Sequence, residues 1–223
     1  MPQPQTAAKI MPPQEAILDI AALQATPLCT EPYDYLIVPN FISASALEAI
    51  DKDYPQIAKR GSFPLHLLSY GPAFKELLAA LQGDAFRRAV EQKFSLDLTD
   101  KPTMFTVRGH CGTKDGYIHT DSQSKIITVL LYMNQQWQEK EGGRLRVLRS
   151  KNIDDVAAEV PPASGTLLLF RRADNSFHGH KPYIGPRKVI QMNWVADQQF
   201  ADRNIFRHTL STFFKKLNPF AGY

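Results

Sequence analysis

The sequence predicts one mainly β domain, a jelly roll (double-stranded β-helix) or barrel, with helices packed outside one of its sheets. Helical periodicity dominates the first 100 residues, whereas short strand-like runs separated by turn residues follow from Pro102. The composition, with 43% hydrophobic and 22% charged residues, supplies enough apolar material for a core. No internal repeat and no linker divides the 223 residues, so one main domain is expected.

Three regions are expected along the chain: a proline-rich segment over residues 1–30, the jelly-roll domain over residues 31–200 and a basic helix over residues 201–223. Seven of the 16 prolines fall within the first 39 residues, so little stable structure is expected at the start of the chain. A short helix is nevertheless indicated over Gln14–Leu23, where apolar residues recur at helical spacing.

The main domain is predicted to open with a strand over Tyr33–Phe41, which is rich in aromatic and β-branched residues. Ser45 and Glu48 then have the S-x-x-E spacing of a capping box, in which the first residue caps a helix. This pattern predicts a helix that runs to about Asp53.

Two further helices are predicted over Ala73–Leu81 and Asp84–Phe94, separated by Gly83 and with Asp84 as the N-cap of the second. Period-two or wholly apolar runs replace the helical pattern beyond them. The predicted strands are Thr103–Arg108, Lys125–Asn134, Arg144–Leu148, Gly165–Arg171, Ser176–Tyr183 and Arg187–Val195.

The C-terminal segment carries most of the excess positive charge. The formal net charge is +4, and residues 201–223 hold four basic residues against one acidic residue, so the rest of the chain is close to neutral. This distribution gives no reason to expect a nucleic-acid partner. Apolar residues at helical spacing predict an amphipathic helix that docks on the sheet, with a membrane surface or a dimer contact as alternatives. Its apolar stripe consists of Phe206, Leu210, Phe213, Phe214 and Leu217.

Several functional classes are disfavoured by what the sequence lacks. No apolar run approaches the ~20 residues of a membrane span, and no glycine-rich nucleotide-binding motif is present. The two cysteines, Cys29 and Cys111, are too few for a disulfide framework or a cysteine-based zinc site. A reducing compartment, the cytoplasm, is therefore expected.

The candidate chemistry centres on the sequence His119-Thr120-Asp121. Residues two apart on an extended chain point to the same face, so His119 and Asp121 can bind one metal ion together. A histidine from a later strand would complete a set of two histidines and one carboxylate, which leaves positions open and suits Fe(II) in oxygen chemistry. His178 and His180 both fit that place, and spacing alone does not choose between them.

Two other features stand where such a site needs them. The strongly apolar strand Lys125–Asn134 follows the H-x-D directly, and Arg187 begins the strand after the second histidine. A buried arginine there could receive the far carboxylate of a dicarboxylic cosubstrate, because its planar guanidinium binds carboxylates bidentately. Strand alternation places Val189, Gln191 and Asn193 on the same face as Arg187.

The run from HTDSQSKIITVLLYMN through GGRLRVL and VPPASGTLLLF to FHGHKPYIGPRKVIQMNW resembles the catalytic core of the prolyl-4-hydroxylase-type 2-oxoglutarate/Fe(II) oxygenases. The motifs follow the order of that family, and they are specific in combination rather than singly. The resemblance covers about Pro102–Val195, which is under half of the chain. Residues Tyr33–Pro55 resemble the opening strand and helix of the superfamily more loosely.

The resemblance implies a set of iron ligands. It identifies His119, Asp121 and His178 as the three side chains that bind Fe(II). In the family a proline typically falls four residues after the second histidine, and Pro182 therefore favours His178 as the ligand. His180 is then expected to line the pocket or to support a ligand.

The same resemblance implies a pocket for 2-oxoglutarate. Arg187 and Tyr132 are expected to hold its C5 carboxylate, and His110 lies near where relatives place a residue that touches cosubstrate or substrate. A surface-loop position for His110 is the alternative. Thr128 shares a strand face with Tyr132, and Gln191 shares one with Arg187, so both are expected to line the pocket.

The implied function is that of a non-haem Fe(II)/2-oxoglutarate-dependent dioxygenase that hydroxylates an unidentified small molecule or polypeptide. O₂ would be consumed, and 2-oxoglutarate would be converted to succinate and CO₂. Asp121 fills the position where halogenating relatives have a small residue, which favours hydroxylation. A catalytically silent jelly-roll module that binds a metal or ligand is the alternative. A nucleic-acid demethylase on this scaffold is disfavoured, because RKVIQMN replaces the R-x-N-x-T-x-R run of those enzymes.

Overall fold

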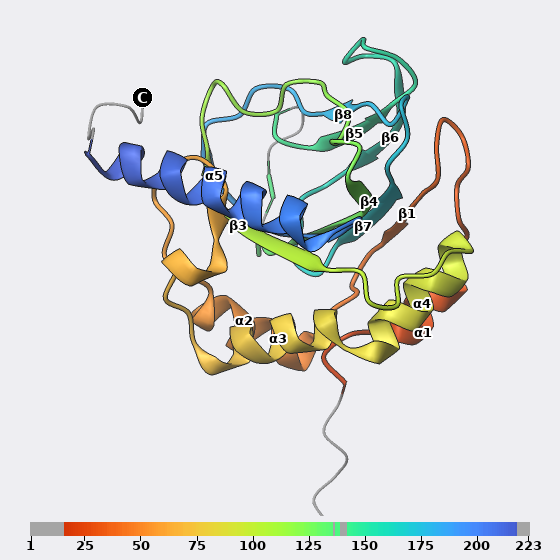
Figure 1. The fold of residues 1–223 in the computed structure, drawn as a ribbon, viewed down its shortest axis with the longest axis horizontal. Helices are drawn as coiled ribbons and strands as arrows, with labels where there is room; N and C mark the ends of the chain where they lie inside the picture. The colour runs from red at the N-terminus through yellow and green to blue at the C-terminus, as the bar shows by residue number, and fades with distance from the viewer. Residues whose placement is uncertain (1–15, 136, 139–141, 218–223) are drawn as a thin grey trace, which may run out of the picture.

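The computed structural model describes residues 16–135, 137–138 and 142–217, which form two sheets and a set of helices (Figure 1). The large sheet has the strand order β1-β7-β4-β9-β3-β2, and the small sheet has the order β6-β5-β8. Neighbouring strands pair antiparallel in both sheets. The strands are β1 (Tyr35–Val38), β2 (Phe63–Pro64), β3 (Thr103–Cys111), β4 (Lys125–Tyr132), β5 (Leu145–Leu148), β6 (Val156–Val160), β7 (Leu167–Arg171), β8 (His178–Gly179) and β9 (Gly185–Val195).

The helices gather on the side of the large sheet that faces away from the small sheet. Figure 1 shows α1–α4 as a layer beneath the large sheet, with the small sheet on the other side and α5 crossing in front of β3. The helices are α1 (Ile20–Ala25), α2 (Ala44–Asp53), α3 (Pro72–Gln82), α4 (Asp84–Phe94) and α5 (Gln198–Leu217), with a 3₁₀ turn η1 (Leu65–Leu67). This arrangement confirms the predicted mainly β jelly roll with helices outside one sheet. None of the helices in the described ranges is long and apolar enough to cross a membrane.

Strand alternation divides the apolar core into two layers, and β4 shows how. Ile127, Val129 and Leu131 pack with the helices, whereas Leu130 and Tyr132 on the opposite face pack with the small sheet. The strand is apolar on both faces because both faces are covered. The even-numbered face of β4 therefore lies between the two sheets, where the candidate site is found.

In the helical part of the chain the predicted helices form, but two of the predicted N-caps are wrong. The helices α3 and α4 lie where they were expected, within one residue at each end. The capping box was wrong: α2 begins at Ala44 with Ser43 as its N-cap, and Ser45 lies inside the first turn. Asp84 is likewise not an N-cap, because Gly83 takes that place and Asp84 pairs instead with Arg87 at 3.1 Å.

The expected N-terminal helix is shorter than predicted and is tied into the core. It begins at Ile20, because the carboxylate of Asp19 accepts a hydrogen bond from the Ala22 amide at 2.8 Å and caps the helix. Leu18 and Leu23 of this segment are buried in the helical core layer. The first two residues of the predicted helix, 14 and 15, lie outside the described residues.

Four strands differ from the prediction. The strand β3 runs on to Cys111, through residues predicted as a turn, whereas the expected strand Ser176–Tyr183 is reduced to His178–Gly179. The sequence reading missed β2 and β6. The alanines and the glutamate of β6 (VAAEV) give little alternation, so nothing in its pattern marked it as a strand.

The C-terminal helix forms as predicted, but Phe206 does not dock. Its side chain is 66% exposed, whereas Ala201 is buried and Ile205 and Thr209 are partly buried. The hydroxyl of Thr209 also lies 3.1 Å from Nε2 of His66. The docked side of α5 therefore runs through positions 201, 205 and 209, and the predicted stripe was wrong at Phe206. The side chains of the other stripe residues lie outside the described residues.

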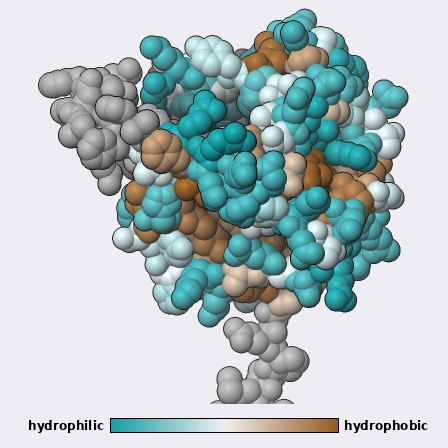
Figure 2. All heavy atoms as spheres, in the orientation of Figure 1, coloured by the Kyte–Doolittle hydropathy of each residue, from teal (hydrophilic) through white to brown (hydrophobic). Residues whose placement is uncertain are grey.

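Figure 2 views the molecule from the side on which α5 crosses the sheet. Hydrophilic residues dominate this face, and the hydrophobic residues form separate patches between them. Among the described residues, the large hydrophobic side chains that are exposed are Tyr117, Ile184 and Phe206. They belong to three different segments, so none of these segments exposes a run of large apolar residues.

Candidate metal centre

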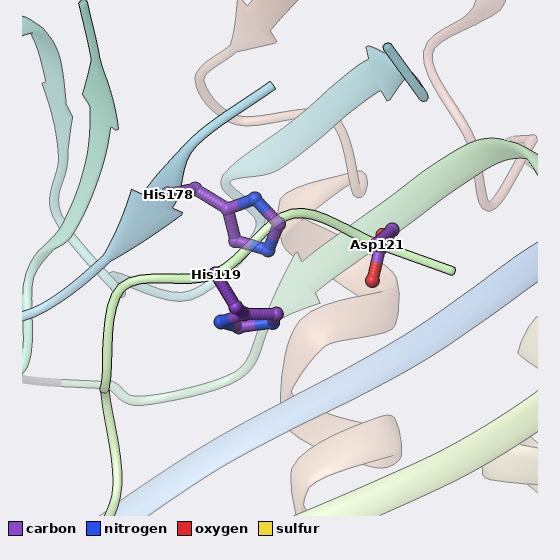
Figure 3. Close-up of side chains that lie close together, drawn as sticks. All are labelled: His119, Asp121 and His178. Atoms are coloured by element: carbon purple, nitrogen blue, oxygen red, sulfur yellow. The ribbon is translucent and has the colours of Figure 1, made fainter. Parts of the chain in front are cut away.

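The three predicted metal ligands meet at one point between the sheets. His119 and Asp121 come from the segment between β3 and β4, and His178 begins β8 (Figure 3). The backbones of His119 and His178 pair in both directions, with N···O distances of 3.1 and 3.0 Å. One possible ligand atom from each of the three side chains lies within 4.8 Å of the others. The cluster therefore depends on a two-residue bridge between segments almost 60 positions apart.

Hydrogen bonds fix the tautomers of both histidines. Nδ1 of His119 lies 2.8 Å from the Tyr117 carbonyl, and Nδ1 of His178 lies 2.9 Å from the Ser176 carbonyl. A carbonyl only accepts, so Nδ1 is the protonated nitrogen in each ring. In the neutral form of each ring, Nε2 then carries no proton and can bind a metal ion.

Asp121 is held as a buried carboxylate. Its side chain is 5% exposed, and it accepts hydrogen bonds from Lys125 Nζ at 2.7 Å and from Thr128 Oγ1 at 2.5 Å. Thr128 Oγ1 in turn accepts from Asn193 Nδ2 at 2.7 Å. Burial raises the pKa of Asp121, but the charges of Lys125 and His178 and the two hydrogen bonds outweigh it and lower the pKa overall. Asp121 is therefore ionised at neutral pH, as a metal ligand must be.

Replacing Thr128 with valine is expected to weaken metal binding about tenfold, because a partner that orients a ligand typically contributes this much to metal affinity. The variant removes the donor to Asp121 and the acceptor for Asn193 while nearly keeping the shape of the side chain. Anaerobic titration with Fe(II) measures the effect. Thr106→Val is the matched control, because Thr106 is a buried threonine that lines the same cavity from β3. Equal Fe(II) affinities of the two variants would contradict the orienting role.

A cavity of about 310 Å³ adjoins the cluster, and its walls come from both sheets. Arg187 and Tyr132 lie at its buried end, where the guanidinium stands over the tyrosine ring at 5.2 Å. Nε of Arg187 donates to the Gly143 carbonyl at 2.7 Å. Arg187 Nη2 and the Tyr132 hydroxyl are both buried, and neither has a hydrogen-bond partner within the described part of the chain. Buried donors of this kind need an acceptor, and an anionic ligand would supply it.

The other predicted pocket residues separate into two groups. Thr128, Gln191 and His180 line the cavity as expected. His180 is not part of the metal cluster, and its Nδ1 lies 2.8 Å from the Lys181 carbonyl. His110 is not among the residues that line the cavity, so its contact with cosubstrate or substrate stays a prediction.

A β-bulge explains the position of His110. The register of β3 against β9 shifts between Arg108 and His110, so the alternation that puts Arg108 in the cavity is interrupted at Gly109. A side chain at Gly109 would collide with the Ile57 backbone, since an added Cβ would lie 2.4 Å from its carbonyl oxygen. After the bulge it is Cys111, not His110, that lies near the charge of Arg187.

Two residues of the site were not predicted from the sequence. Lys125 contacts the carboxylate of Asp121, and Cys111 lies near the charge of Arg187. Asn193, which strand alternation placed on the face of Arg187, donates to Thr128. Lys125 and Cys111 lie next to register shifts, which the residue pattern does not reveal.

His178 and His180, two of the three histidines that line the cavity, are held neutral by their surroundings. Burial lowers the pKa of His178 to about 4, against the opposing charge of Asp121. Burial, followed by the charge of Arg187, also lowers the pKa of His180 to about 4. An unfolded histidine titrates near pH 6.5, so the unfolded chain binds more protons than the folded chain between about pH 6.5 and 4.

The metal-free protein is therefore expected to lose stability as the pH falls from 6.5 to 4, and to hold this part of its stability above pH 6.5. Each histidine contributes a slope of about 1.4 kcal/mol per pH unit within that window. Urea unfolding at several pH values measures the slope. His180→Asn removes one of the two titrating histidines, so it is expected to reduce the slope by about 1.4 kcal/mol per pH unit. An unchanged slope in that variant would show that His180 is not buried as a neutral ring.

Comparison with known proteins agrees with this geometry. Residues 105–196 match the model of the family described as the 2OG-Fe(II) oxygenase superfamily. Curated protein sequences give no match to the chain. The matched range contains all three residues of the metal cluster together with Tyr132 and Arg187. The resemblance predicted from the motifs is therefore confirmed, and this family implies Fe(II), 2-oxoglutarate and O₂.

Solved structures with similar folds include three prolyl hydroxylases. One from Pseudomonas putida is 19% identical, with a TM-score of 0.54 over 80% of this chain and 98% of that chain. One from Phytophthora capsici is 16% identical, with a TM-score of 0.53 over 83% of this chain and 68% of that chain. The viral collagen prolyl hydroxylase from Paramecium bursaria Chlorella virus-1, in its 2OG complex, is 14% identical, with a TM-score of 0.52 over 74% and 96%. At these identities the likeness concerns the fold.

Proposed function

Because residues 105–196 match the model of the 2OG-Fe(II) oxygenase superfamily, we propose that this protein is an Fe(II)- and 2-oxoglutarate-dependent dioxygenase. It hydroxylates its substrate and converts 2-oxoglutarate to succinate and CO₂. The observation that carries the proposal is the convergence of His119, Asp121 and His178 on a cavity whose buried end holds two unpaired polar groups, on Arg187 and Tyr132.

The residues of the cluster fit Fe(II). Two neutral imidazoles and one carboxylate form a donor set that leaves several coordination positions open, as non-haem oxygenases require, whereas structural zinc takes a closed set of four. His119, Asp121 and His178 would hold the metal. The bound iron supplies the activation of O₂ that is coupled to the decarboxylation of 2-oxoglutarate.

The buried end of the cavity fits the far carboxylate of 2-oxoglutarate. The guanidinium of Arg187 and the hydroxyl of Tyr132 each present a donor without a partner, and a carboxylate would satisfy both. Burial raises the pKa of the Tyr132 hydroxyl, although the charge of Arg187 opposes this, so the hydroxyl stays protonated and can donate. In this role Arg187 and Tyr132 orient the cosubstrate and take no part in proton transfer.

The remaining lining residues protect and orient the reactive end. Leu130, Leu145 and Val189 line the same cavity and limit the access of water to it. Thr128 and Lys125 hold the carboxylate of Asp121, so that ligand keeps one orientation.

The substrate is expected to present one small group to the cavity. A volume of about 310 Å³ is at the lower end of ligand pockets, which span roughly 300–1,000 Å³, and the cosubstrate shares this space. A small molecule or a single side chain of a polypeptide fits this limit. A cytoplasmic location belongs to the same proposal, because Cys29 and Cys111 are both free thiols.

The test is an oxygen-consumption assay of the purified full chain with Fe(II) and 2-oxoglutarate labelled at C1. Release of labelled CO₂ with equimolar succinate, stopped by a chelator and restored by Fe(II), is expected even at the slow rate without substrate. Pools of small metabolites and peptides are then scanned for stimulation. Binding of Fe(II) and 2-oxoglutarate without any turnover would indicate the silent binding module, and failure to bind either would overturn the proposal.

A further inference from the structure

We propose that the substrate carries an acidic group, a carboxylate or a phosphate, and that Lys125 binds this group. The inference rests on the proposed function and concerns the substrate end of the same cavity. The residues that line the cavity carry an excess of positive charge. Among the described residues that line the cavity, Arg108, Lys125 and Arg187 are permanently basic, whereas Asp121 is the single acidic side chain.

Two of the three basic side chains already have a partner or a role. Arg108 pairs with Asp115 at 3.0 Å and donates to the Ser62 hydroxyl at 2.9 Å, so its charge is balanced outside the cavity lining. Arg187 is buried beside Tyr132 and is assigned to the far carboxylate of the cosubstrate. Lys125 is the third basic group, and its partner at 2.7 Å is Asp121, one of the predicted metal ligands.

Lys125 lies beside the metal cluster, at the less deeply buried end of the cavity. Its side chain is 13% exposed, and the neighbouring Thr120 and Ser122, which also line the cavity, are partly or fully exposed. Arg187 and Tyr132 are far more deeply buried. Lys125 and Tyr132 are seven positions apart in β4, which is about 23 Å along an extended strand. Lys125 can therefore contact a substrate group beside the metal cluster, away from Arg187 and Tyr132.

A register shift brings Lys125 to this place. The cavity face of β4 carries even-numbered residues, but the pairing of β4 with β9 shifts between Lys125 and Ile127. Ile126 consequently packs toward the helical core layer, while Lys125 turns toward the cavity. The bulge thus places an ammonium group within 2.7 Å of a metal ligand.

The charges of the loaded site leave Lys125 without a full counter-charge. Asp121 is its present partner, but that carboxylate also binds the Fe(II) dication when the metal is held. Taken together, Fe(II), Lys125 and Arg187 carry four positive charges, whereas 2-oxoglutarate and Asp121 carry three negative charges. One positive charge remains, in a site where a poorly solvated charge needs a partner. An anionic group on the substrate would supply it, close to the carbon that is oxidised.

The experiment compares small acids with their neutral counterparts as probes. The full chain is loaded with Ni(II), as an inert substitute for Fe(II), and with 2-oxoglutarate. Acetate and methyl phosphate are then titrated against acetamide, by ligand-observed NMR, in wild type, Lys125→Met and Lys125→Arg. Lys52→Met is the matched control, because Lys52 forms an i, i+4 pair with Glu48 at the same 2.7 Å but on exposed α2.

Wild type and Lys52→Met are expected to bind the acids about tenfold more tightly than acetamide, and this preference should weaken with salt. Lys125→Met should lose the preference, and Lys125→Arg should keep it. The stronger of the two acids identifies whether a carboxylate or a phosphate is favoured.

Three results would overturn the inference. Equal binding of acids and amide in wild type shows no anion site, and a preference that persists in Lys125→Met places the anion on the metal. Weaker 2-oxoglutarate binding in Lys125→Met, with the preference intact, would assign Lys125 to the cosubstrate. Failure of wild type to load Ni(II) and 2-oxoglutarate is a different result, since it contradicts the proposed function and this inference together.

Discussion

Asp121→Ala is expected to weaken Fe(II) binding by more than about a hundredfold and to bring succinate formation down to the background rate. The outer residues that orient a metal ligand typically contribute about tenfold to a hundredfold in affinity, so loss of the ligand itself must cost more. His119 and His178 remain in this variant, but two neutral imidazoles offer the dication no negative charge. Anaerobic Fe(II) titration and labelled CO₂ release measure the two effects.

A loss of folding must be separated from the loss of a ligand. Removing Asp121 leaves the ammonium of Lys125 mostly buried without its 2.7 Å partner, and a broken buried pair typically costs about 3–5 kcal/mol. The double variant Asp121→Ala/Lys125→Met removes both charges and is expected to regain stability in urea unfolding without regaining Fe(II) affinity. Recovery of Fe(II) binding in the double variant would show that Asp121 is not a ligand.

Asp115→Ala is the matched control for the loss of a carboxylate. Asp115 lies in the same segment as Asp121, and the Gly112 amide and Arg108 lower its pKa although burial opposes them. It is not part of the metal cluster. Its variant is expected to keep Fe(II) affinity close to that of wild type. If Asp115→Ala lost as much Fe(II) affinity as Asp121→Ala, the loss would reflect a disturbance of the segment between β3 and β4 and not the removal of a metal ligand.

The sequence predicted the metal cluster because its information is local. H-x-D places two ligands on one face of an extended chain, and the histidine that follows the later turn was narrowed to two candidates. What the residues alone left open was the choice between His178 and His180. In the structure the backbone bridge between His119 and His178 makes that choice, since it brings His178 to the cluster and leaves His180 facing Arg187. A pairing between distant segments has no trace in the pattern of either segment.

Bulges limited the prediction of the cavity walls. Strand alternation gives the right residues along β9, where Arg187, Val189 and Gln191 all line the cavity as expected. Strand alternation fails where the pairing register shifts, because a neighbouring residue then takes the place of the predicted one. His110 was predicted in the pocket but Cys111 lies beside Arg187 instead, and Lys125 reaches the cavity against the parity of β4.

Arg187→Met is expected to raise the KM for 2-oxoglutarate by about tenfold to a hundredfold while kcat changes far less. A hydrogen bond to a charged group typically contributes about 1.5–3 kcal/mol, and each 1.4 kcal/mol corresponds to a factor of ten in affinity. The variant keeps most of the apolar contact with the ring of Tyr132 but removes the donors that face the far carboxylate. Initial rates of CO₂ release at varied 2-oxoglutarate concentration measure the change.

A second cosubstrate separates recognition of the carboxylate from damage to the fold. 2-Oxobutyrate has the keto acid end of 2-oxoglutarate but no far carboxylate, so it gains nothing from Arg187 in wild type. The preference for 2-oxoglutarate over 2-oxobutyrate should therefore collapse in Arg187→Met, although loss of the donor to the Gly143 carbonyl also lowers stability by about 1–3 kcal/mol. A general disturbance of the site would slow both keto acids alike and keep the preference. Arg187→Lys should retain part of it, because the charge remains while the planar fork is lost.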